Sequence, residues 1–121
     1  MEQTKGIPVL PDALLQLIHQ GKGLTVEFKK STMDITKDVY DTVCSFSNRE
    51  GGHLFLGVKD NGTILGVDPA YVDQMVKDFV VTINNENNLY PPLYLTPEVY
   101  QFQGKLIMYV SACGKNLRPV P

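Results

Sequence analysis

An acidic and a basic side chain near the start of the chain could together bind a metal ion or a phosphate. Residues 24–30 alternate apolar and polar side chains with period two, which predicts a half-buried strand. Glu27 and Lys29 then share the polar face of that strand. A carboxylate that binds a divalent cation beside a lysine that contacts a phosphate would suit nucleic-acid chemistry. A solvent-exposed ion pair of little energetic value explains the same two residues, so the pair alone leaves both interpretations open.

The longest ordered pattern follows this strand and runs from a helix into a glycine pair. Val39, Val43 and Phe46 have the i, i+4, i+7 spacing of an amphipathic helix, which we expect to begin near residue 34. The candidate N-cap residues are Ser31, Thr32 and Asp34. Gly51 and Gly52 end this helix, because glycine adopts the left-handed conformation without a Cβ clash. We expect a strand to start directly after them.

The segment after the glycine pair predicts a buried strand followed by a tight turn. Residues 54–58 form a nearly continuous apolar run, which is typical of a strand buried on both faces. Gly57 within this run indicates a bulge or the close approach of another backbone. Residues 60–63 read Asp-Asn-Gly-Thr, and Asn-Gly tolerates the positive φ angles of a type I′ turn. We expect residues 63–67 to form the returning strand.

The remaining patterns complete an α+β domain with a mixed sheet and about three helices. Residues 11–21 predict the first helix, and Asp68-Pro69 predicts the start of a third helix with a wide apolar face. Residues 99–102 and 106–110 predict a hairpin across Gln103-Gly104. The expected order of elements is α-β-α-β-β-α-β-β.

Three segments carry a resemblance to a known family. They are Val26-Glu27-Phe28-Lys29, Val43-Cys44-Ser45-Phe46-Ser47-Asn48 and residues 51–62. In order and spacing they resemble the Schlafen-type Alba domain, formerly called the divergent AAA domain, which stands at the N-terminus of many bacterial transcriptional regulators. The similarity extends to residues 64–67 and, more loosely, to Pro91-Pro92 and residues 105–110, so it covers most of residues 10–121. The resemblance implies a nucleic-acid-associated domain, often followed by a C-terminal winged-helix segment.

The resemblance also implies where a metal site would lie. Family members that cleave RNA hold a divalent metal with two glutamates near the first strand and an aspartate after the strand that follows the glycine pair. The second glutamate matches Glu27 and the aspartate matches Asp60, so these are the candidate catalytic and metal-binding residues for Mg²⁺ or Mn²⁺. The first glutamate falls on Lys22, and a cation there would repel a metal ion, which leaves the nuclease motif incomplete. The chain has no Gly-x-x-x-x-Gly-Lys-Ser/Thr phosphate loop, so an ATPase has no motif either.

Composition and charge restrict how the chain could contact a nucleic acid. A length of 121 residues with 43% hydrophobic residues suits a single domain over residues 1–121. A net charge of −2 argues against a protein that coats nucleic acid by bulk charge, so any contact requires a local basic patch. The candidate residues for that patch are Lys22, Lys29, Lys30, Arg49 and Lys59. Scattered solubilising charges would explain the same residues.

Other chemistries lack a recognisable motif. Cys44 and Cys113 belong to no Cys-x-x-Cys or Cys/His cluster, and we expect both to be core thiols. His19 and His53 have no partner motif, so we expect structural or surface roles for them. No signal peptide is recognisable, and no window approaches the ~20 apolar residues of a spanning helix. We therefore expect a cytoplasmic protein with no membrane partner.

These observations leave three functions open. The first is a noncatalytic nucleic-acid-binding module of a transcriptional regulator, in which Lys29 and Lys30 contact phosphates and Glu27 orients Lys29. The second is a metal-dependent nuclease that uses Glu27 and Asp60. The third is a protein-interaction or dimerisation domain, since edge strands and the apolar third helix would support a homodimer. We expect the first function, with DNA or RNA as the partner and with residues 116–121 leading to a C-terminal domain.

Overall fold

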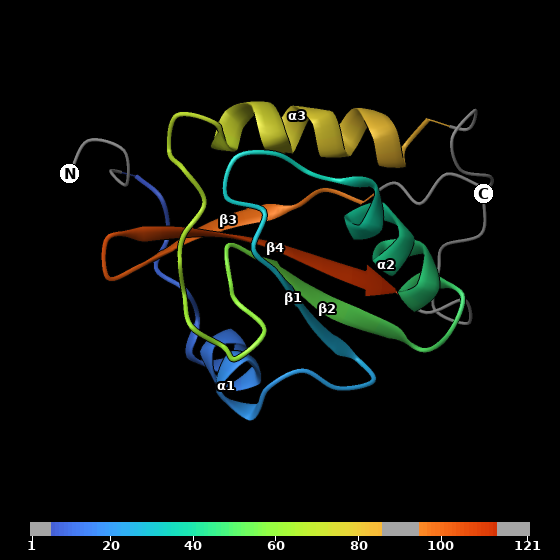
Figure 1. Ribbon diagram of the computed structural model, residues 1–121, viewed down its shortest axis with the longest axis horizontal. Helices are drawn as coiled ribbons and strands as arrows, with labels where there is room; N and C mark the ends of the chain where they lie inside the picture. The colour runs from blue at the N-terminus through green and yellow to red at the C-terminus, as the bar shows by residue number, and fades with distance from the viewer. Residues whose placement is uncertain (1–5, 86–94, 114–121) are drawn as a thin grey trace.

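A computed structural model describes residues 6–85 and 95–113 of the protein. In these residues a four-stranded mixed sheet has the strand order β1-β2-β4-β3 (Figure 1). The strands are β1 (Val26–Lys29), β2 (Gly51–Leu56), β3 (Glu98–Phe102) and β4 (Lys105–Cys113). β1 pairs with β2 in parallel, whereas β4 pairs antiparallel with both β2 and β3.

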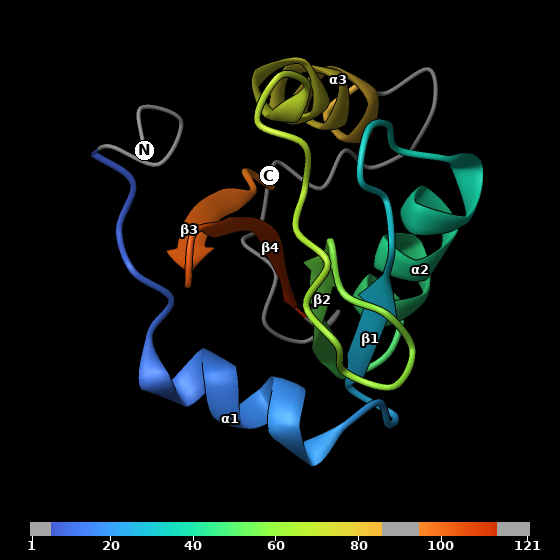
Figure 2. The same ribbon diagram turned by 60° about the vertical axis from the view of Figure 1, so that its left-hand side comes forward.

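Three helices cover the two faces of the sheet in this part of the chain. They are α1 (Asp12–Gln20), α2 (Lys37–Ser47) and α3 (Val72–Ile83). Figure 2 shows α1 on one face, with α2 and α3 on the other. The predicted α+β class, with its mixed sheet and three helices, is confirmed.

Hydrophobic side chains on the two faces of the sheet form two separate cores. Leu54 and Leu56 of β2 belong to the core beneath α2 and α3, whereas Phe55 belongs to the core beneath α1. All three side chains are fully buried. Because successive residues of a strand point to opposite faces, this arrangement explains the continuous apolar run. The prediction of a strand buried on both faces is confirmed.

The helix between β1 and β2 begins later than its sequence suggests. Its N-cap is Thr36, which has an extended backbone, so the predicted start near residue 34 is too early. The predicted N-cap residues Ser31, Thr32 and Asp34 all lie in the preceding loop. The loop is held out of the helix because the Thr32 carbonyl accepts a hydrogen bond from the Asp68 N–H at 2.7 Å, and Ser31 has a φ of 31°.

The glycine pair that follows α2 is required by backbone conformation and by packing. Gly51 has a φ of 93°, a left-handed conformation that glycine adopts without a Cβ clash where the turn after α2 enters β2. A Cβ on Gly52 would lie 2.6 Å from ring atoms of Phe46. The prediction that a strand starts at this pair is confirmed, whereas α2 already ends at Ser47 and a turn over residues 48–50 separates it from the glycines.

The chain after β2 turns tightly and returns beside itself. Gly57 has a φ of 90°, and its carbonyl accepts hydrogen bonds from the N–H groups of Leu65 (2.8 Å) and Gly66 (2.9 Å). A Cβ on Gly57 would lie 3.0 Å from the Val67 nitrogen, which confirms the predicted close backbone approach. The returning segment pairs through the single bridges Val58–Ile64 and Val67–Leu106 rather than through a continuous strand. Positive φ angles at Gly57 and Gly66 interrupt the extended ladder there.

The other predicted boundaries are close to those observed. The hairpin between β3 and β4 turns at Gln103 and Gly104, whose φ angles of 51° and 81° suit a type I′ turn. Asp68-Pro69 forms a turn ahead of α3, in which the Asp68 carbonyl accepts from the Tyr71 N–H at 2.9 Å. Pro91-Pro92 and residues 116–121 lie outside the described residues. Within the described chain, no helix has the length and apolar character needed to cross a membrane.

Candidate nucleic-acid interface

Glu27 and Asp60, the two candidate metal ligands, converge on the side chain of Lys22. The Lys22 Nζ atom lies 3.1 Å from Glu27 Oε1 and 3.2 Å from Asp60 Oδ1. Hydrogen bonds to Glu27 first and to Asp60 second raise the pKa of Lys22 above its ordinary value, so the ammonium stays charged. The three residues therefore form a compact cluster in which one cation bridges two anions.

Three separate segments place this cluster. Lys22 follows Gly21, which ends α1 with a φ of 94° and donates its N–H to the carbonyls of Leu17 and Ile18. Glu27 is part of β1. Asp60 lies in the turn after β2, which is closed by a 2.8 Å hydrogen bond from the Gly62 N–H to the Lys59 carbonyl. The turn packs close to the end of α1, where a Cβ on Gly62 would lie 3.4 Å from the Ile18 carbonyl oxygen.

The arrangement does not fit a divalent metal. Mg²⁺ and Ca²⁺ need several oxygen ligands at about 2.0–2.6 Å, and an ammonium beside two carboxylates repels such an ion. Across residues 6–85 and 95–113, no group of three or more His, Cys, Asp or Glu side chains could hold a metal ion. Glu27 and Asp60 thus lie close together, as the resemblance implies, but the Lys22 ammonium compensates their negative charge.

Lys29 does not pair with Glu27, contrary to the idea that Glu27 orients it. Its Nζ atom lies 2.8 Å from Asp38 Oδ2, in the first turn of α2. Lys29 first, and the Thr36 hydroxyl second, lower the pKa of Asp38. No pattern in the sequence indicates this ion pair, since its partners are nine positions apart on different elements. The Lys29 charge is therefore partly compensated within the protein.

Lys30 and Lys59 lie at the carboxyl ends of the two parallel strands. The Lys29 carbonyl accepts hydrogen bonds from the N–H groups of Gly57 (2.8 Å) and Val58 (3.1 Å), so the chain segments that follow β1 and β2 run side by side. Lys30 is exposed and Lys59 is half-buried. Neither forms an ion pair with another described residue. The N-terminus of α2 lies at the same end of the strands, which is where ligands commonly bind to parallel βαβ units.

Arg49 stands apart from these two lysines, at the far end of α2. Its Nε atom donates to the Ser45 carbonyl at 3.4 Å. It borders a groove of about 240 Å³ that Glu27 and the side chains of α2 also line. The eleven residues of α2 span about 16 Å, so the structure splits the predicted basic patch into two places.

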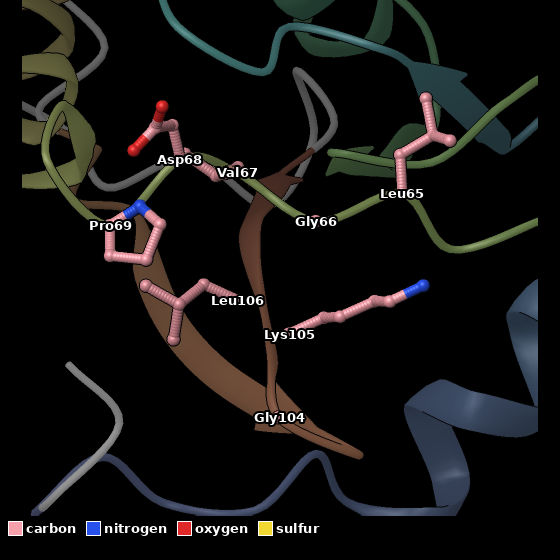
Figure 3. A pocket seen from close by; sticks show the side chains of 8 residues that line it. All are labelled: Leu65, Gly66, Val67, Asp68, Pro69, Gly104, Lys105 and Leu106. Carbon is pink, nitrogen blue, oxygen red and sulfur yellow. The ribbon is translucent and has the colours of Figure 1, made fainter. Parts of the chain in front are cut away.

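A second hollow, of about 300 Å³, lies between residues 65–69 and the turn that joins β3 and β4 (Figure 3). None of the predicted site residues lines it. Lys105 donates to the Ile64 carbonyl at 3.2 Å, and Asp68 accepts from the Ala70 N–H at 2.9 Å. Figure 3 shows these two charged groups pointing in different directions, so they do not converge on a common ligand.

The two other residues considered for chemistry have structural surroundings. His53 Nδ1 lies 2.6 Å from the Tyr109 hydroxyl oxygen, and the two rings stack with centroids 5.9 Å apart. Burial lowers the pKa of His53, so the ring is neutral at physiological pH. Burial raises the pKa of the half-buried Cys44 thiol, which is typical of an unreactive core cysteine.

The fold and this cluster define a small α+β domain built on a parallel βαβ unit, with a lysine between one carboxylate within the first strand and another in the turn after the second strand. A family model described as Schlafen, AlbA_2 matches residues 22–120. The match covers most of the chain, so the chain belongs to this family, which is associated with nucleic acids. A search of curated proteins found no match.

Proposed function

We propose that this domain binds the phosphate backbone of a nucleic acid without cutting it. The observation that carries the proposal is the Lys22 ammonium, at 3.1 Å and 3.2 Å from the carboxylates of Glu27 and Asp60. These are the groups that would have to hold a catalytic metal. Because Lys22 compensates their charge, the domain retains the fold of a nucleic-acid-associated family without the means to bind Mg²⁺ or Mn²⁺.

The phosphate contacts in this proposal come from Lys30 and Lys59. Both are free of ion pairs with described residues, and both follow strands whose ends are joined by backbone hydrogen bonds. An ammonium without a carboxylate partner can contact a phosphate without first breaking an ion pair. Lys22 and Lys29 would have to break such pairs, so we assign them weaker contributions than their sequence suggests. Arg49 would contact the same strand about 16 Å away, at the other end of α2.

The net charge of −2 supports weak, salt-dependent binding rather than tight coating. Each phosphate contact to a single strand contributes about 0.7 to the slope of log affinity against log salt. Removal of both lysines should therefore lower the slope by about 1.4 and weaken binding to all sequences alike.

The proposal is tested by fluorescence anisotropy with labelled single-stranded RNA and DNA over a series of salt concentrations. The double variant Lys30→Ala/Lys59→Ala is compared with Lys77→Ala, which removes a charge from the exposed face of α3. We expect the double variant to bind both strands more weakly and with a smaller slope of log affinity against log salt. Lys77→Ala should keep the affinity and the slope of wild type. Equal effects of the two variants on binding would contradict the assignment of the phosphate contacts to Lys30 and Lys59.

A finer part of the proposal concerns the biological setting. The resemblance to domains at the N-terminus of bacterial regulators supports a cytoplasmic regulatory role beside a C-terminal domain.

A nuclease is the second candidate function, and the convergence of Glu27 and Asp60 favours it. Lys22 opposes it, because the nucleic-acid phosphate and the metal would both have to displace an ammonium already held by two carboxylates.

A further inference from the structure

The two outer strands of the sheet have differently protected edges. Residues 8–10 run along β3, where the Leu10 N–H donates to the Gln101 carbonyl at 2.8 Å and the Gln101 N–H donates to the Pro8 carbonyl at 2.9 Å. β1 is the first strand in the sheet order, and among the described residues no further strand pairs with it (Figure 1). An open edge can pair with a strand of another molecule, so natural proteins usually protect it.

The backbone hydrogen bonds of β1 show which residues face outward. The Thr25 carbonyl accepts from the His53 N–H at 2.7 Å, and the Lys29 carbonyl accepts from the Gly57 N–H at 2.8 Å. Backbone groups alternate in direction along a strand, so the odd-numbered residues face β2. The N–H and carbonyl groups of Val26 and Phe28 therefore point to the open edge.

Two of these outward groups are bonded within the same chain. The Gly23 N–H donates to the Val26 carbonyl at 3.0 Å. The Phe28 N–H donates to Oε1 of Glu27 at 3.0 Å, so the side chain of one strand residue covers the backbone donor of the next. The same Oε1 atom accepts from Lys22, which is also held by Asp60. The ion pairs thus fix the carboxylate in the position that covers the edge.

We infer that Lys22, Glu27 and Asp60 cap the edge of β1, and that the cap prevents this edge from pairing with β1 of a second copy of the chain. The inference does not depend on nucleic-acid binding. It assigns the predicted homodimer a specific surface, and it states that the intact cluster keeps that surface closed.

Without its cap, the edge of β1 would suit pairing with β1 of a second copy of the chain. Two antiparallel copies of β1 related by a two-fold axis at Phe28 would bring the outward N–H and carbonyl of Phe28 in each copy opposite those of the other, so this edge is complementary to itself once the cap is removed. Leu24 precedes β1 with 83% of its surface exposed, and Met33 follows it with 54% exposed. An antiparallel arrangement brings the Leu24 end of one copy to the Met33 end of the other, so both apolar side chains could lose solvent contact.

The experiment compares Glu27→Ala with Asp41→Ala. The control removes the same charge and also breaks an exposed ion pair, Lys37–Asp41 at 3.0 Å, but it lies on α2 away from the edge. Sedimentation velocity over a range of concentrations measures self-association, and amide hydrogen exchange by NMR reports on the Phe28 N–H.

We expect wild type and Asp41→Ala to remain monomeric with a protected Phe28 amide. In dilute Glu27→Ala the Phe28 amide should exchange roughly five-fold faster, as for the loss of one hydrogen bond, and protection should return as the variant dimerises with concentration. If Glu27→Ala does not fold, Lys22→Ala, which keeps the carboxylate but removes its anchor, should show the same changes in smaller degree.

Three results would overturn the inference. They are an unchanged Phe28 exchange rate in the folded variants, a monomer at every concentration despite faster exchange, and equal self-association of Glu27→Ala and Asp41→Ala.

Discussion

The ammonium of Lys22 lies 3.1 Å from Oε1 of Glu27, and this one contact links two properties of the domain. It compensates a carboxylate that would otherwise be free to bind a metal. It also holds that carboxylate against the Phe28 N–H, 3.0 Å away, at the outer edge of the sheet. This single lysine thus affects both the charge of the site and the protection of the strand beside it.

Replacement of this lysine by an acid should create metal binding. Lys22→Glu would place three carboxylates where one ammonium now bridges two, which suits Mn²⁺. We expect isothermal titration calorimetry to show at least about tenfold tighter Mn²⁺ binding to this variant than to wild type, or about 1.4 kcal/mol. Lys22→Gln is the matched control and should bind no better than wild type. Equally tight binding by wild type would show that Lys22 does not exclude the ion.

Gly52 should tolerate no side chain. Its Cβ would lie 2.6 Å from the Phe46 ring, and Phe46 is buried in the core beneath α2 and α3. We expect Gly52→Ala to lower the free energy of unfolding by about 1–3 kcal/mol in urea denaturation, as for other overpacked cores. Gly23→Ala is the control, because nothing lies within 4 Å of its Cβ position. A loss of similar size at Gly23 would refute the packing explanation.

The Lys29–Asp38 pair should make stability depend on pH in the acid range. The folded state lowers the pKa of Asp38 below its ordinary value of 3.8. The stabilisation of the folded state by the ionised Asp38 is therefore complete above that value and is lost as pH falls through the folded pKa. Since Asp38 is 59% exposed, we expect Asp38→Asn to cost less than about 1 kcal/mol near neutral pH. The difference from wild type should disappear in strong acid. A difference independent of pH would assign the effect to something other than this charge.

His53 should contribute a second, separate pH dependence. Burial lowers its pKa from the ordinary 6.5, so the folded state resists protonation. The corresponding stability is present above 6.5 and is lost as pH falls through the folded pKa. Thermal unfolding of wild type should therefore weaken more than that of His53→Phe between about pH 7 and pH 5. Parallel curves for the two proteins would show that His53 is not the titrating group.

Much of the fold follows from local patterns in the sequence. Residues 54–56 alternate between the two cores, and the Gln103-Gly104 turn has φ angles that suit a type I′ turn. The start of α2 was harder to predict, because Thr32 is held in the loop by a hydrogen bond to Asp68, far along the chain. Local propensity carries no information about such a contact.

The ion pairs at the candidate site were not predictable from the sequence. Resemblance placed Glu27 and Asp60 together, and the structure joins them through Lys22, 38 positions from Asp60. The partner of Lys29 could not be read from strand alternation, since Asp38 reaches it from a helix that packs against the strand. Likewise, the sequence shows the basic residues of the predicted patch but not that carboxylates compensate two of them, Lys22 and Lys29.

The most direct test of a binding domain without nuclease activity uses end-labelled structured RNA and single-stranded DNA in the presence of Mn²⁺. Wild type and Glu27→Ala, purified identically, are incubated with each substrate, and the products are separated on a denaturing gel while binding is followed on a native gel. We predict that both proteins shift the labelled strands and leave them intact. Cleavage by wild type that is lost in Glu27→Ala would show that the carboxylates work despite Lys22, and would contradict the proposed function.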